Sequence, residues 1–128
     1  EDIISGSGIS KIYETLTQDK LSAEEIFKKF LDKEPDALFV INGFIKSLSQ
    51  TLSDLALSFL PGKGILLAGS LSRSIYTHFN EQNFFKPFIN DNTGMHFDIL
   101  KNTPIGVITK ERTPLYGNLA FYKNLNKI

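Results

Sequence analysis

The chain has 128 residues, 41% of them hydrophobic, and its 14 basic residues balance its 14 acidic ones. This length and composition are typical of a single domain over residues 1–128, and the balanced charge argues against nucleic-acid binding. The absence of cysteine excludes disulfides, thiolate metal sites and a cysteine nucleophile. The absence of cysteine also agrees with a reducing compartment, so we expect a cytoplasmic location. Because the apolar runs are shorter than the ~20 residues that span a bilayer, we expect no membrane partner.

The first half of the chain is predicted to form three helices. After the turn Ser5–Gly8, the first amphipathic helix presents Ile9, Ile12, Tyr13 and Leu16. Ser22 and Glu25 form a capping box before a second helix with the apolar face Ile26, Phe27, Phe30 and Leu31, while Lys28, Lys29 and Lys33 face water. A long third helix runs from Pro35 to Pro61-Gly62, with Leu38, Ile41, Ile45, Leu48, Leu52, Leu55 and Phe59 in the core.

The second half is predicted to alternate strands and helices. The continuous apolar run at Ile65–Ala68 indicates a strand buried on both faces, and Ser72 is expected to cap a helix carrying Ile75, Tyr76 and Phe79. Near-helical spacing follows at Phe84–Ile89, then a turn at Asn90–Gly94 and a second strand at Pro104–Thr109. Pro114 is expected to begin a last helix with Leu115, Leu119, Tyr122 and Leu125 facing inward. We expect the strands to be parallel and joined by a right-handed helical crossover.

Two glycine-containing turns are candidates for a ligand site. In Ser5–Gly8, the glycines permit close approach to the backbone, and the helix that follows offers N–H groups to a ligand. In Lys63–Leu71, a buried strand ends at Gly69-Ser70, and open α/β sheets bind ligands at the carboxyl ends of their strands. Each turn also has a purely structural interpretation, as a helix cap and as a tight strand-to-helix turn respectively.

The succession of these segments resembles the C-terminal part of bacterial glucokinases. Glu1–Tyr13 is similar to their Ser-Gly-x-Gly helix start, and Gly64–Leu71 to the adenosine motif of the sugar kinase, actin and Hsp70 superfamily. Phe84-Phe85, Pro104–Thr109 and Thr113–Ala120 resemble the glucokinase C-terminus in order and spacing, so the similarity covers nearly the whole chain. The chain departs from the family at Gly69-Ser70, where Gly-Gly is usual, and at Leu115–Asn118, where more glycines are common.

The resemblance implies a fold and an activity. The fold is α/β: the C-terminal lobe of a ribonuclease-H-like (actin-like ATPase) sugar kinase, helix-rich with a small parallel sheet. The activity is the ATP-dependent phosphorylation of glucose to glucose 6-phosphate, with ATP and Mg²⁺ as cofactors. Gly6, Ser7, Gly69 and Ser70 are expected to line the adenosine pocket.

In the family, the phosphate loops and the catalytic aspartate precede these motifs, and no match to them occurs in this chain. We therefore expect a cut piece that is inactive alone and that self-associates through an apolar surface. The alternative is a sugar-kinase-like module that serves dimerisation or regulation without catalysis.

The remaining reactive side chains fit no catalytic pattern. His78 and His96 lack the paired spacing of metal ligands, and no motif singles out Asp91 or Asp98 as a base. The cluster Phe84, Phe85 and Phe88 is expected to pack in the core, because no basic residues are interleaved with it.

Overall fold

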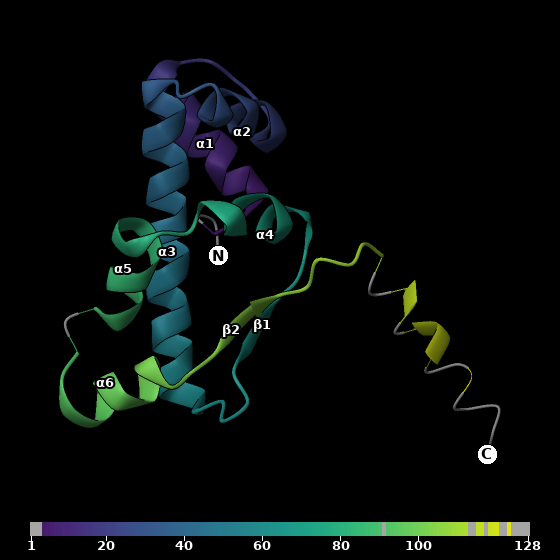
Figure 1. Ribbon diagram of the computed structural model, residues 1–128. Coiled ribbons are helices and arrows are strands. Elements are labelled where there is room, and N and C mark those ends of the chain that lie inside the picture. The colour runs from purple at the N-terminus through teal and green to yellow at the C-terminus, as the bar shows by residue number, and fades with distance from the viewer. Residues whose placement is uncertain (1–3, 91, 113–114, 117, 121–122, 124–128) are drawn as a thin grey trace.

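The computed structural model describes residues 4–90, 92–112, 115–116, 118–120 and 123. Its helices and strands follow in the order α1 (Gly6–Thr17), α2 (Ala23–Leu31), α3 (Pro35–Phe59), β1 (Ile65–Leu67), α4 (Ser70–Ile75), α5 (Lys86–Ile89), α6 (Gly94–Lys101) and β2 (Ile105–Val107). A 3₁₀ turn, η1 (Tyr76–His78), and a π-helical turn, η2 (Glu81–Phe85), join α4 to α5. Figure 1 shows α3 as a long rod with α1 and α2 beside one half and α5 and α6 beside the other.

Local sequence signals account for the boundaries of α2 and α3. The predicted capping box is confirmed: the Ser22 hydroxyl accepts from the Glu25 N–H, and the Glu25 carboxylate accepts from the Ser22 N–H at 2.8 Å. Pro35 occupies the first turn of α3, where its missing N–H costs no helical hydrogen bond. The helix ends at Phe59, and its C-cap residue Leu60 has a left-handed conformation with φ 48°.

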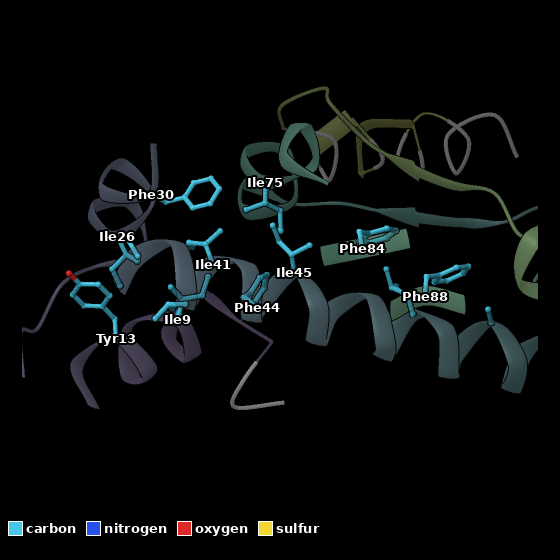
Figure 2. Packing of buried hydrophobic residues seen from close by; sticks show 14 of the residues in the cluster. Ile9, Tyr13, Ile26, Phe30, Ile41, Phe44, Ile45, Ile75, Phe84 and Phe88 are labelled. Carbon is cyan, nitrogen blue, oxygen red and sulfur yellow. The ribbon is translucent and has the colours of Figure 1, made fainter. Parts of the chain in front are cut away.

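The hydrophobic core forms between α3 and the helices packed along it. Figure 2 shows Ile9 and Ile26, from α1 and α2, near Ile41 on α3. Phe84 from η2 and Phe88 from α5 lie beside a more distant part of α3. The buried hydroxyl of Ser49 donates a hydrogen bond to the carbonyl oxygen of Phe84, which ties α3 to η2. These contacts hold the helices around α3.

The two predicted strands form a parallel pair. Ile65 is in register with Ile105, Leu66 with Gly106 and Leu67 with Val107, so the predicted direction is confirmed. The expectation that β1 is buried on both faces is wrong, because Leu66 is 71% exposed. Ile65 and Leu67 pack against the core, whereas no described element covers the opposite face, where Leu66 lies over Gly106. The chain is therefore a helix-rich α/β protein with a small parallel sheet.

Several residues predicted to be in the core are exposed. They come from both halves of the chain, and the exposed positions are Leu16, Leu31, Leu55, Phe59, Phe85, Leu115 and Leu119. Tyr76, expected on the inner face of a helix, is also exposed and belongs to η1. Pro114, Tyr122 and Leu125 lie outside the described residues.

Helix α6 is absent from the predicted order. Met95 and Phe97 on this helix are exposed, and Leu100 is its buried residue. The apolar residues of the segment therefore do not form one continuous buried face with helical spacing. The helix is short and packs one side chain into the core, which explains why the pattern did not reveal it.

Candidate functional site

The segment Ser5–Gly8 forms a capped helix start. Ser5 has an extended backbone, and its hydroxyl accepts a hydrogen bond from the Gly8 N–H at 3.0 Å. Gly6 is the first residue of α1 and is half-buried, Gly8 is buried, and Ser7 is exposed. The capping interpretation is therefore confirmed. The cap uses the N–H of Gly8 and leaves Gly6 at the surface of a hollow between helices.

The turn after β1 depends on the backbone freedom of Gly69. This residue has φ 121° and ψ 163°, a conformation that L side chains rarely adopt. It is the N-cap of α4, which begins at Ser70, so the predicted cap at Ser72 is wrong by three residues. A Cβ atom at Gly69 would meet no atom within 4 Å, so the backbone angle, and not the surrounding packing, requires glycine there.

Gly6 and Ser70 meet in one pocket of about 410 Å³. This volume lies within the range of small-molecule sites. The other side chains that line the pocket come from α2 and α4: Ala23, Glu24, Phe27, Lys28, Leu71 and Ser74. Ser7 and Gly69 are not among the lining residues, so the structure brings two of the four predicted site residues together.

The pocket lies next to the carboxyl end of β1. Ala68 and Gly69 separate β1 from α4, and Ser70, the first residue of α4, forms one part of the wall. The first residue of α1 forms another part, because Gly6 approaches α2 so closely that a Cβ on it would lie 3.6 Å from the Cβ of Ala23. This is the location where open α/β sheets bind their ligands.

Helix α2 is the part of the site that the sequence did not reveal. Phe27 lines the pocket, and its ring lies 5.6 Å from the rings of Phe30 and His78. Lys28 was predicted to face water, and it is both exposed and part of the pocket wall. The amphipathic pattern of α2 contains no signal that distinguishes a pocket wall from a solvated helix face.

The charged groups of the wall form no ion pair or side-chain hydrogen bond among the described residues, although Lys28 interacts electrostatically with Glu25. Glu24 and Lys28 stand one helical turn apart on α2, and neither makes an ion pair or a side-chain hydrogen bond there. The ion pair found in that part of the chain joins Lys29 to Glu34 at 2.8 Å, and this hydrogen bond raises the pKa of Lys29. Glu24 and Lys28 are therefore available to a ligand.

Other candidate positions carry no chemistry in the described part of the chain. No group of three His, Asp or Glu residues there can hold a metal ion. His78 packs edge-on against Phe30, with ring centroids 4.9 Å apart, and Asp91 lies outside the described residues. A larger hollow of about 730 Å³ runs between α3 and η2, but it contains none of the predicted site residues. None of the described helices has the length and apolar character needed to cross a membrane.

Fold and pocket together define a helix-rich α/β protein with a ligand-sized pocket at the end of a parallel strand. The family model described as Glucokinase matches residues 1–125. The chain therefore belongs to the glucokinase family.

Curated relatives support the same family over part of their length. A glucokinase of Mesorhizobium japonicum is 28% identical over 131 aligned positions, which include 97% of this chain and 38% of the relative. Glucokinases of Caulobacter vibrioides and Brucella abortus are 26% and 27% identical, with 91% and 94% of this chain aligned to 37% of each. The chain thus spans less than two-fifths of the length of these relatives.

Proposed function

We propose that the chain is the C-terminal, nucleotide-binding lobe of a ribonuclease-H-like glucokinase, folded as one domain over residues 1–128. The full-length protein is then a cytoplasmic transferase of glycolysis that phosphorylates glucose with ATP. The observation that carries this proposal is the meeting of Gly6 and Ser70 in one ligand-sized pocket. They belong to segments far apart in the sequence that resemble the two adenosine-binding motifs of the family.

The four glycine and serine residues have different roles in this proposal. Gly6 leaves space against Ala23 for the nucleotide, and the Ser70 hydroxyl offers it a hydrogen bond. Gly69 holds the turn that presents Ser70, and Ser7, which is exposed beside the pocket, contacts the nucleotide at the rim. The pocket accommodates the base and ribose of ATP.

The phosphates and the metal require groups that the described part of the chain does not bring together. The described residues contain no cluster of carboxylates and histidines that fits Mg²⁺. Phosphoryl transfer depends on positioning the phosphates and neutralising their charge, so a lobe without phosphate loops or a catalytic aspartate does not phosphorylate glucose alone. We assign Mg²⁺, glucose and the catalytic base to the remainder of the full-length protein.

A second candidate function is a dimerisation or regulatory module without catalysis. The exposed face of the sheet around Leu66 favours it, because an apolar sheet face is a typical contact surface between protein copies. The two candidates differ in one property: only the kinase requires ATP in the pocket between α1 and α4.

Replacement of Gly6 by alanine in the full-length protein tests the proposal. The added methyl group would make an ordinary 3.6 Å contact with Ala23, so the fold tolerates it while the pocket becomes smaller. We expect the KM for ATP to rise about tenfold and the KM for glucose to stay unchanged, because a methyl group in a fitted pocket is worth about 1–3 kcal/mol. Gly69 is less suitable, since any side chain there strains the backbone.

The matched control is Gly43→Ala on α3, where a Cβ meets no atom within 4 Å. Steady-state kinetics with ATP and glucose varied separately give both constants. If Gly6→Ala and Gly43→Ala enzymes have the same KM for ATP, the nucleotide does not occupy this pocket. Absence of ATP binding by calorimetry would instead favour the regulatory module.

A further inference from the structure

Helix α2 forms a third wall of the pocket that contains Gly6 and Ser70. Figure 1 shows α1, α2 and α4 gathered around the same half of α3. Neither nucleotide motif includes any part of α2, yet half of the residues that line the pocket come from it: Ala23, Glu24, Phe27 and Lys28. The wall contributed by α2 therefore has a function that the two motifs do not describe.

The apolar part of this wall suits a flat ring. Phe27 from α2 and Leu71 from α4 both line the pocket. The Phe27 ring stacks on Phe30 and meets His78 edge-on, so neighbouring rings already hold it in position before a ligand arrives. A preordered apolar wall costs little conformational entropy on binding and favours the base over the phosphates.

The charges on α2 also distinguish between the parts of a nucleotide. The carboxylate of Glu24 and the ammonium group of Lys28 cancel, so the wall has no net positive charge to attract phosphates, and the carboxylate repels them. A carboxylate accepts hydrogen bonds and an ammonium group donates them. The polar edge of a purine base presents both a donor and an acceptor. In the described part of the chain, Glu24 and Lys28 form no ion pair or side-chain hydrogen bond, and the interaction of Lys28 with the exposed Glu25 is electrostatic, so their hydrogen-bonding atoms face no direct competitor.

We infer that Glu24 and Lys28 hydrogen-bond the polar edge of a purine base, which lies against Phe27 and Leu71. This inference rests on the proposed function, and it assigns the base preference of the site to α2. The glycine and serine turns then contact the ribose side of the nucleotide.

The test compares adenosine with ADP, which share the base and differ in the phosphates. Calorimetric titration of the full-length protein gives both dissociation constants for the unchanged protein and for Glu24→Met and Lys28→Met. Methionine is unbranched and a good helix former, so α2 remains folded, as the melting temperature verifies. In each variant the dissociation constants of adenosine and ADP are expected to rise by the same factor, about three- to tenfold, because one hydrogen bond to the base is lost.

Matched controls are Glu14→Met and Lys11→Met, at exposed positions of α1 outside the pocket, and these leave both constants unchanged. Weaker binding of ADP alone in the α2 variants would place the phosphates at α2 and overturn the inference. Unchanged binding of both ligands would overturn it as well, while the proposed function would stand. If the unchanged protein binds neither adenosine nor ADP, the proposed function fails and the inference fails with it.

Discussion

Replacing Gly64 with alanine should disrupt the strand pair that leads into the turn at Gly69. Gly64 has φ 98°, and a Cβ on it would lie 2.3 Å from the carbonyl oxygen of Pro104, far inside van der Waals contact. That same oxygen accepts the N–H of Ile65 at 2.9 Å, the hydrogen bond at the beginning of the parallel pair. The obstacle is backbone, so a change of side-chain rotamer cannot relieve it.

Two terms set the size of the effect. A residue with a Cβ held at this positive φ costs about 1–3 kcal/mol of backbone strain. Moving Pro104 away to relieve the contact breaks the hydrogen bond to Ile65, which contributes about 0.5–1.5 kcal/mol. We therefore expect Gly64→Ala to lower the free energy of unfolding by about 2–4 kcal/mol and the melting temperature by about 8–15 °C.

Gly62→Ala is the matched control, because it is the same substitution two residues away and its Cβ meets no atom within 4 Å. Urea denaturation followed by circular dichroism gives the free energy of unfolding of both variants. We expect the control to change it by less than about 0.5 kcal/mol. If Gly64→Ala is within about 1 kcal/mol of Gly62→Ala, the close approach of Gly64 to Pro104 does not constrain the sheet.

Two further predictions concern the exposed sheet face and α2. We expect two copies of the chain to associate through their exposed Leu66 sheet faces. The Leu66→Lys variant should therefore sediment as a monomer in sedimentation velocity. A sedimentation coefficient equal to that of the unchanged chain would contradict this. Hydrogen bonds from the Ser22 backbone N–H and, to a smaller extent, from the Ser22 hydroxyl lower the pKa of Glu25 below its ordinary 4.5. The ionised Glu25 carboxylate therefore stabilises the fold above pH 4.5, and this contribution disappears as the pH falls through the lowered pKa. Thermal melting of the unchanged chain and of Glu25→Gln should therefore differ near neutral pH and converge in acid, whereas a difference independent of pH would refute the capping role.

Local sequence patterns determined the elements whose signals lie within a few residues of each other. The capping box at Ser22 and Glu25, the proline at the start of α3 and the strands at Ile65 and Ile105 were all predicted, because caps, prolines and short apolar runs act on the backbone next to them. The parallel direction followed from the helices that separate the strands. The candidate turns at Gly6 and Gly69 were visible because glycine permits backbone geometries that other residues avoid.

Only the tertiary structure decided which faces are covered and which residues share a pocket. Leu55 and Leu66 belong to apolar patterns as regular as those of buried residues, but their exposure depends on whether another element packs on that side. Lys28 and Ser70 lie far apart in the sequence, and they line one pocket because α2 and α4 pack around the same half of α3. A periodic sequence specifies that a helix has an apolar face, but the identity of the partner that meets this face is a property of the whole chain.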